Sequence, residues 1–345
     1  ERHGFDYDNK EKIAQQLQTF RGEVEKYKDH PALLAWAVGN EVDLFYTNTN
    51  VWYAVNDIAA MIHEIDPNHP TVTVTAGYDT AETRLIIERA PHIDIYGINT
   101  YGDIGIVYDN IRTTKWDKPY IISEWGPNGH WEVQKTAWGV PVEQSSTEKA
   151  ESYKQRYLQS IQRDTEKCIG SYVFLWGQKQ ETTSTWYGLF DETGAVSQAI
   201  NELEKLWTGR TPKNSAPVMH ALTLHNQVKG DTILLEANNT YFASVDVTDP
   251  DGDKLKFKWE VIFESQDIKS GGDAETKPAS VKGLSMRKMG NEIRFRAPAA
   301  EGAYRLFFYA YDGQGNYAYQ NIPFYVLPAV GDANYRFVEM KKQSL

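Results

Sequence analysis

Residues 33–41 read Leu33-Leu34-Ala35-Trp36-Ala37-Val38-Gly39-Asn40-Glu41, a short apolar run that ends in an amide and a carboxylate. A second apolar run, residues 120–123, leads in the same way into Glu124-Trp125-Gly126. Short apolar runs bounded by turn residues are typical of buried strands. The C-terminal ends of parallel strands lie on one rim of a sheet. The sequence therefore predicts that Glu41 and Glu124 share such a rim.

Residues 1–208 alternate strands of this kind with helices of amphipathic pattern. We expect strands at residues 33–38, 71–75, 93–99, 120–123 and 170–176. We expect helices at residues 10–28, 51–65, 80–89, 105–112, 145–163 and 195–207, with N-caps at Asp8, Asn50 and either Asp79 or Thr80, and a capping box at Ser145–Glu148. This alternation predicts an α/β domain with a parallel sheet.

The expected sheet has five strands, whereas a closed barrel of this kind has eight. Two arrangements fit the pattern. The first is a (β/α)8 TIM barrel of which this chain holds strands four to eight, with three strands preceding Glu1. The second is an open, doubly wound sheet of five strands. The chain begins at Glu1 rather than at Met, and we therefore expect it to start inside a longer gene product.

The composition changes at residues 209–217, where Gly, Pro, Ser and Asn predict a linker. Residues 218–345 read as an all-β domain, and we expect an immunoglobulin-like β-sandwich. Its strands are expected at residues 240–247, 255–263, 291–296, 302–311 and 317–327, with a hairpin loop at residues 312–316. Residues 331–345 would form an edge strand or a polar tail.

The acidic run Asp246-Val247-Thr248-Asp249-Pro250-Asp251-Gly252-Asp253 resembles turns of cadherin-like and polycystic-kidney-disease-like repeats. Clustered carboxylates suit a hard cation such as calcium. Asp and Gly are also ordinary turn formers. We expect a turn here rather than a metal site.

Composition excludes several classes of function. The net charge of −11 disfavours binding to nucleic acid or to an anionic membrane surface, which needs clustered Lys and Arg. A single cysteine, Cys168, excludes an intrachain disulfide and a multi-cysteine metal site. Aromatic residues make up 13% of the chain, which suits a sugar-binding cleft, although β-rich domains also carry many tyrosines. No stretch has the length of a membrane span, and no signal peptide is visible.

Several motifs together resemble one family of barrels. Residues 30–41 resemble the fourth-strand signature of the glycoside hydrolase family two barrel, and residues 121–126 resemble the seventh strand of the same retaining clan. Asn99-Thr100-Tyr101 resembles the end of the sixth strand, Phe174-Leu175-Trp176 the eighth strand, and residues 186–191 the loop that precedes the last helix. The resemblance covers about residues 1–207.

The resemblance implies a role for each matching residue. Glu41 would be the general acid/base and Glu124 the nucleophile of a two-carboxylate mechanism. Asn40 would contact the sugar 2-hydroxyl, and Tyr101 would donate a hydrogen bond to Glu124. Trp176 would form the floor of the sugar subsite. Each residue also has a structural interpretation. The glutamates could cap a turn or form an ion pair, Asn40 could be a turn residue, and Tyr101 and Trp176 could be packed aromatic side chains.

Other residues are candidates for the surroundings of the cleft. Trp125, with Trp36 or Trp176, could provide a dry setting for the carboxyls, and Trp125 is also a candidate contact for the substrate. Arg2 and His3 resemble residues just beyond the third strand and could reach the cleft. His130 and Trp131 follow the nucleophile and could line outer subsites, although ordinary loop packing also explains them. No metal and no cofactor are expected.

Two hypotheses follow. The first is hydrolysis or transglycosylation of β-glycosidic bonds in an oligosaccharide or polysaccharide, with a covalent glycosyl-enzyme intermediate. The alternative is a non-catalytic carbohydrate-binding or scaffold protein that keeps the barrel fold. We expect an extracytoplasmic location, because immunoglobulin-like appendages on glycosidases usually lie there. A barrel that lacks three strands exposes two sheet edges, so residues 1–345 alone would be weakly active or inactive.

Overall fold

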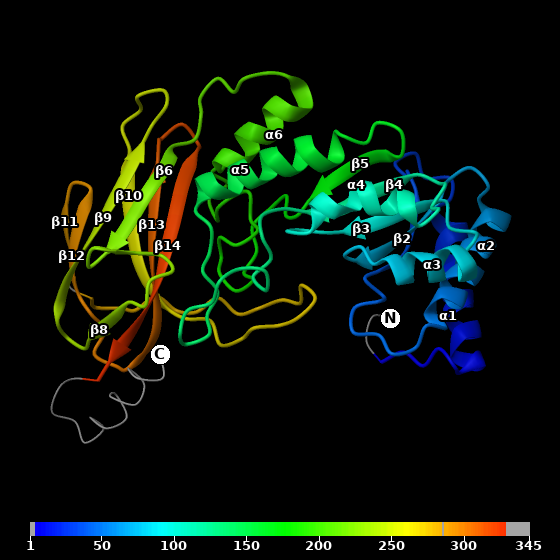
Figure 1. Cartoon of the computed structure of the whole chain (residues 1–345), viewed down its shortest axis with the longest axis horizontal. Coiled ribbons are helices and arrows are strands. Elements are labelled where there is room, and N and C mark those ends of the chain that lie inside the picture. Colours follow the sequence, from blue (N-terminus) through cyan, green and yellow to red (C-terminus); the bar gives the residue numbers. More distant parts are fainter. Residues whose placement is uncertain (1–3, 285, 329–345) are drawn as a thin grey trace. The chain divides into compact units, whose positions relative to one another are not determined.

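The computed structural model describes residues 4–284 and 286–328 (Figure 1). They form two compact units. The first holds residues 4–125 and 156–174, and the second holds residues 126–155 and 175–328. We expected a boundary at residues 209–217, but that segment lies inside the second unit. Arg2, His3 and the expected C-terminal segment 331–345 lie outside the described residues.

The first unit is built on a parallel sheet of five strands, one for each strand that the sequence predicts. They are β1 (Trp36–Asn40), β2 (Thr71–Ala76), β3 (Ile95–Asn99), β4 (Tyr120–Trp125) and β5 (Cys168–Val173). Their spatial order is β1-β2-β3-β4-β5, the order of the chain. A doubly wound sheet reverses its strand order at a switch point. The doubly wound alternative is therefore wrong, because this order has no reversal.

One helix precedes the first strand of this sheet, and further helices connect its successive strands. They are α1 (Lys10–Tyr27), which precedes β1, then α2 (Val51–Ile65), α3 (Thr80–Arg89), α4 (Ile104–Thr113) and a π-helical stretch η1 (Tyr157–Ile161). Asp79 caps α3 as expected, by accepting from the Glu82 N–H at 2.8 Å. The cap of α1 is Asn9 rather than Asp8, because Asn9 Oδ1 accepts from two N–H groups of the first turn. Asn50 begins α2 without a side-chain capping bond.

Strands β2 and β3 lie in the middle of the sheet and are almost entirely buried. Val72, Val74 and Ile95 form an apolar cluster there, with Ala35 and Ile121 packed against it. The outer strands β1 and β5 are partly exposed. Because the strands are parallel, the C-terminal ends of β1 and β4 lie on the same rim of the sheet, with the C-terminal ends of β2 and β3 between them.

The second unit contains two mainly antiparallel sheets that share one core. One has the order β10-β13-β14-β8 and the other β11-β12-β9-β6-β7. The strands are β6 (Val218–Leu224), β7 (Gln227–Val228), β8 (Leu234–Glu236), β9 (Thr240–Thr248), β10 (Lys256–Phe263), β11 (Met286–Met289), β12 (Glu292–Arg296), β13 (Gly302–Tyr311) and β14 (Tyr317–Leu327). The two sheets contribute to a common cluster that includes Val245, Ile293, Phe308 and Phe324. The predicted hairpin loop 312–316 joins β13 and β14. That the arrangement is immunoglobulin-like stays a prediction.

Two helices also belong to the second unit, α5 (Ser146–Arg156, apart from its last residue) and α6 (Gln198–Thr208). The capping box predicted for α5 is present, with Ser145 and Glu148 each accepting the other's N–H. The expected linker 209–217 has neither helix nor strand, yet it is fastened at both ends. Gly209 ends α6 in a left-handed conformation, and the Ala216 N–H donates to Asn201 at 2.7 Å.

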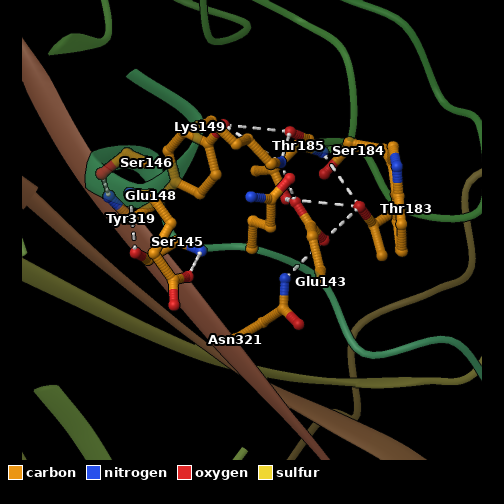
Figure 2. A network of polar contacts seen from close by, with 12 residues as sticks. Glu143, Ser145, Ser146, Glu148, Lys149, Thr183, Ser184, Thr185, Tyr319 and Asn321 are labelled. Carbon is orange, nitrogen blue, oxygen red and sulfur yellow. Dashed lines mark hydrogen bonds and ion pairs between the residues drawn. The ribbon is translucent and has the colours of Figure 1, made fainter. Parts of the chain in front are cut away.

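A buried polar network joins residues 143–149 and 183–185 to strand β14 within the second unit (Figure 2). Glu143 is fully buried and accepts from Lys149 Nζ at 2.5 Å and from Asn321 Nδ2 at 2.6 Å. It also accepts from the hydroxyls of Thr183 and Thr185, at 2.6 and 2.8 Å. A buried ion pair that is saturated with hydrogen bonds in this way tolerates little displacement of its members.

The charges in this network influence each other's ionisation. Burial lowers the pKa of Lys149 to about 8, against the opposing effect of Glu143. Burial would raise the pKa of Glu143, but Lys149 and Arg305 outweigh it and hold that pKa below its usual value. Arg305, from β13, donates to Asn321 Oδ1 at 2.8 Å and pairs with Glu264. The segments 126–155 and 175–208 are therefore part of the same compact unit as the two antiparallel sheets.

Among the described residues, no helix combines the length and apolar character needed to cross a membrane.

Candidate active site

The first carboxylate of the site follows β1 directly. Glu41 has a φ of +50° and Gly39 a φ of +83°. A Cβ on Gly39 would lie 2.7 Å from Val42 Cγ1, so this turn requires glycine there. The Glu41 N–H donates to Val74 O at 2.9 Å. A non-glycine residue at positive φ costs about 1–2 kcal/mol and persists where its surroundings hold it.

Asn99, at the end of β3, links Glu41 to its neighbours. Its Nδ2 donates to Asn40 Oδ1 at 3.1 Å and to Glu41 Oε1 at 3.0 Å. Its Oδ1 accepts from Ser123 Oγ at 2.7 Å. The serine hydroxyl therefore fixes the orientation of the Asn99 amide, with the NH2 group toward Glu41. Asn99 is buried, whereas Asn40 is exposed and Glu41 partly exposed.

The second carboxylate, Glu124, lies near the end of β4 and pairs with Asn99 in the β3–β4 register. Its backbone carbonyl accepts from the Thr100 N–H at 2.8 Å. The Tyr101 hydroxyl donates to Glu124 Oε2 at 3.1 Å, which is the contact that the resemblance implies. Glu41 and Glu124 thus lie on the same edge of the sheet, one on each side of Asn99.

Sequence reasoning gave no role to Asn99, Ser123 or Asp43, although all three lie among these groups. Asn99 ends an apolar strand as Asn40 does, and that position was the available signal. Asp43 is buried, and its carboxylate accepts from the Ala76 N–H, which ties the turn after Glu41 to β2. Nothing in the local sequence distinguishes it from an exposed loop aspartate.

Two of the candidate tryptophans do not fit their expected roles. Trp36 lies at the opposite end of the sheet from the carboxylates, and the side chain of Trp125 is buried. The expectation that Trp36 adjoins the carboxyls is wrong, because it begins β1 at the other end of the strand and donates from Nε1 to Asp66 Oδ2 at 2.8 Å. Trp125 is fully buried, with its ring 6.1 Å from that of Tyr157. Its predicted contact with substrate therefore has no exposed surface to support it.

The remaining candidates that the structure describes lie in the second unit. Trp176 is 57% exposed and packs beside Phe190, with ring centroids 5.3 Å apart. Trp131 is 56% exposed, and its ring lies edge-on to His130 at 4.9 Å. Burial lowers the pKa of His130, which favours a neutral ring. Their roles as sugar platforms stay predictions.

One group of carboxylates could hold a metal ion. Asp249, Asp253 and Asp312 each offer an oxygen, and these atoms lie within 4.8 Å of one another. The same groups also serve turns, since Asp249 Oδ1 accepts from the N–H of Asp253 at 2.9 Å. Asp312 similarly accepts from the N–H of Asn316 at 3.0 Å. These bonds explain the cluster as turn structure.

Residues 3–173 match the sequence model of the glycosyl hydrolases family 2 TIM barrel domain. The match supports a glycosidase of the family 2 type. It covers the whole five-stranded sheet, including both carboxylates and Asn99. No curated protein matches this sequence.

Several solved structures of glycoside hydrolases are similar to this chain. The FMN-binding β-glucuronidase of Facaelibacterium prausnitzii L2-6 has 14% identity and a TM-score of 0.45, with 93% of this chain and 46% of that one covered. The β-galactosidase of the psychrophilic Marinomonas ef1 has 12% identity and a TM-score of 0.44, with 59% and 44% covered. A family 5 mannosidase of Rhizomucor miehei has 15% identity and a TM-score of 0.36, with 55% and 53% covered. The chain spans about half the length of these proteins.

Proposed function

We propose that this protein hydrolyses β-glycosidic bonds by a retaining mechanism with a covalent glycosyl-enzyme intermediate. The observation that carries the proposal is the arrangement around Asn99, which places Glu41 on one side and Glu124 on the other along one edge of the sheet. Family 2 homology of the same segment supports hydrolysis of glycosidic bonds as the general activity.

The two carboxylates have different proposed roles. Glu124 is the nucleophile and attacks the anomeric carbon, while the Tyr101 hydroxyl bonded to Oε2 keeps it oriented. Glu41 protonates the departing glycosidic oxygen. In the second step Glu41 accepts a proton from water, which displaces the sugar from Glu124. Another sugar in place of water would give transglycosylation.

Asn40 is the exposed neighbour of Glu41 and is the proposed partner of the sugar 2-hydroxyl. Because its Oδ1 accepts from Asn99, its amide nitrogen is the group left to donate to the sugar. Trp176, Trp131 and His130 are also proposed as substrate contacts. An extracytoplasmic location is also part of the proposal, and fractionation of cells with an antibody to the β-sandwich would test it.

The test is to trap the intermediate. The full protein is incubated with an activated 2-fluoro β-glycoside, digested and mapped by mass spectrometry, with a panel of gluco, galacto, manno and glucuronic sugars. We expect one sugar to inactivate the protein and to modify Glu124. The variant Glu124→Gln should not be labelled, whereas Glu88→Gln, an exposed acid on α3, should behave as wild type. Binding of sugars without turnover or labelling would instead support the non-catalytic alternative.

A further inference from the structure

Trp176 lies on a stretch of backbone that is hydrogen-bonded to residues 187–190 within the second unit. The N–H and the carbonyl of Leu175 each bond to this segment, at 3.1 and 3.3 Å, and the Phe190 N–H donates to Gly177 O at 3.3 Å. The Trp176 ring also packs edge-on against Phe190, with the centroids 5.3 Å apart. The position of Trp176 therefore depends on where residues 187–190 are held.

Gly188 shows how closely these two stretches of backbone approach each other. A Cβ at this position would lie 3.2 Å from Gly177 O and 3.3 Å from Gln178 Cα. Both are backbone atoms, which cannot rotate aside as a flexible side chain can. Glycine is the residue that permits another part of the backbone to come this close. We therefore expect the two stretches to move together, so that a displacement of residues 187–190 displaces Trp176.

The segment continues into a turn, residues 191–196, that the Asp191 side chain holds in shape. Asp191 Oδ1 accepts from the N–H groups of Thr193 and Ala195, at 2.8 and 2.9 Å. The Asp191 N–H donates to Ala195 O at 3.0 Å, and Gly194 has a φ of +85°, where glycine is favoured. The turn thus uses one carboxylate oxygen of Asp191, and the other oxygen bonds to β13.

Strands β13 and β14 fasten this turn. The Tyr311 hydroxyl, at the end of β13, donates to Asp191 Oδ2 at 2.9 Å. A hydroxyl that donates to a carboxylate makes a stronger bond than a neutral pair does. Val196 donates from its N–H to Gly315 O and accepts from the Tyr317 N–H, both at 2.9 Å. Backbone and side-chain bonds therefore tie the turn to the hairpin that β13 and β14 form.

Apolar packing adds to these bonds. Ala195 is buried in a cluster of side chains from β10, β13 and β14, which are Ile262, Phe307, Tyr309, Tyr317 and Tyr319, with Tyr311 packed against it. The rings of Tyr311 and Tyr317 stack with their centroids 5.9 Å apart. This cluster is separate from the core that the two antiparallel sheets share. The sheet that contains β13 and β14 therefore has a second apolar surface, and the turn covers part of it.

We propose that this sheet positions Trp176 for the substrate and that Tyr311 is a positioning residue, which acts through Asp191 and the segment 187–190. The inference rests on the proposed function, because Trp176 is a substrate contact only within that proposal. It makes the antiparallel sheets part of the sugar-binding apparatus rather than an appendage. Tyr311 itself does not touch the sugar, and its effect passes through the position of Trp176.

The first experiment does not depend on activity. Tyr311→Phe removes the hydroxyl but keeps the ring that stacks on Tyr317, so the sheet should fold as before. Hydrogen exchange of the full protein is followed by mass spectrometry of the peptides that cover residues 175–196. We expect these amides to exchange about 2- to 10-fold faster in Tyr311→Phe, the range that the loss of one hydrogen bond gives, with β6 and β9 unchanged.

The matched control is Tyr325→Phe. Tyr325, on β14, also donates its hydroxyl to a carboxylate, that of Glu301 at 3.0 Å, but this partner lies outside residues 175–196. The control should leave the exchange of residues 175–196 unchanged. Unaltered exchange of these residues in Tyr311→Phe would overturn the positioning role, whether or not a glycoside proves to be a substrate. Equal acceleration in both variants would overturn it too, because that result indicates general loosening.

The second experiment tests whether Tyr311 acts through Trp176. It uses the aryl glycoside of the sugar that labels Glu124 in the trapping experiment, and it measures kcat/KM for Tyr311→Phe, Trp176→Ala and the double variant. We expect Tyr311→Phe to lower kcat/KM about 2- to 10-fold and Trp176→Ala to lower it further. The double variant should match Trp176→Ala, because a residue that acts only through another adds nothing once the other is removed.

Two kinetic results would overturn the inference. Additive losses in the double variant would mean that Tyr311 influences the reaction by a route other than Trp176. A wild-type kcat/KM in Trp176→Ala would mean that the position of this ring does not matter to the reaction. Failure of every sugar to label Glu124 would instead contradict the proposed function, and the exchange experiment would still decide whether Tyr311 holds the segment of Trp176.

Discussion

Asn99 Nδ2 lies 3.0 Å from Glu41 Oε1, although Asn99 ends β3, Glu41 follows β1, and β2 lies between these two strands. The same asparagine pairs directly with Glu124 in the β3–β4 register. One buried amide therefore stands between the two carboxylates on the edge of the sheet. The proposed chemistry depends on this arrangement as well as on the two carboxylates.

Removing this amide should damage catalysis more than folding. We expect Asn99→Ala to lower kcat/KM by about 10- to 100-fold, because a hydrogen bond to a charged group contributes ~1.5–3 kcal/mol. Asn68→Ala, an exposed asparagine at the opposite end of β2, is the matched control and should have no effect. Steady-state kinetics on an aryl glycoside measure both. Wild-type rates for Asn99→Ala would contradict the role given to the amide.

The hydroxyl of Tyr101 should matter to the nucleophile in a similar way. Tyr101→Phe removes the bond to Glu124 Oε2 and keeps the ring against Phe174. We expect about a 10-fold or larger fall in the rate of glycosyl-enzyme formation, measured by the pre-steady-state burst. The control is Tyr53→Phe, an exposed tyrosine of α2, which should leave the burst unchanged. An unaltered burst in Tyr101→Phe would count against Glu124 as the attacking group.

The buried network of the second unit predicts that substitutions of Glu143 and Lys149 have strongly non-additive effects on stability. Lys149→Met leaves Glu143 charged and unpaired, and we expect a loss of about 3–5 kcal/mol in the free energy of unfolding. The double variant Glu143→Leu with Lys149→Met should recover part of that loss. Lys154→Met, at an exposed pair with Glu151, should cost under about 1 kcal/mol. Additive effects of the two buried substitutions in denaturant unfolding would contradict the coupling.

Acid stability of the first unit should depend on Asp164. Its side chain is fully buried and accepts two bonds from Arg112, both at 2.8 Å, and one from Tyr120 at 2.9 Å. Burial would raise its pKa, but these donors lower the pKa to about 2. This stabilisation is complete above the unfolded pKa and is lost as pH falls toward 2. Thermal unfolding at several pH values measures this. Asp164→Asn should destabilise the protein at pH 6 and weaken the dependence of its stability on pH below pH 4, whereas the exposed Asp109→Asn should do neither.

Local sequence was enough to locate the five parallel strands, although β5 ends at Val173 rather than at residue 176. It missed β6, β7, β8 and β11 of the second unit. An apolar run that ends at Asn40-Glu41 or Glu124 predicts where a strand ends, because burial and turn chemistry are local. The same reasoning predicted the capping box at Ser145 and left the cap of α3 open between Asp79 and Thr80, of which the structure has Asp79. It misplaced the cap of α1 by one residue, since Asp and Asn are about equally good N-cap residues and Asp8 and Asn9 are neighbours.

Contacts between distant residues could not be predicted in the same way. Asn99 and Glu41 meet across β2, because the order of the strands in the sheet brings the ends of β1 and β3 close together. No local pattern in the sequence indicates this contact. Glu143 and Asn321 are 178 residues apart, and no local pattern connects them. The burial of Trp125, whose ring lies near that of Tyr157, also depends on the tertiary fold, whereas its place next to Glu124 in the sequence suggested a ring close to the substrate.

The most direct measurement of the central proposal is the separation of the two carboxyl groups in a crystal structure of the full protein. A retaining glycosidase needs the carboxyls of Glu41 and Glu124 about 5–5.5 Å apart, because one of them attacks the anomeric carbon directly and no water has to fit between them. We predict a value in that range. A separation of about 6.5–9.5 Å would indicate inversion instead, and a larger one would contradict the assignment of these two residues as a catalytic pair.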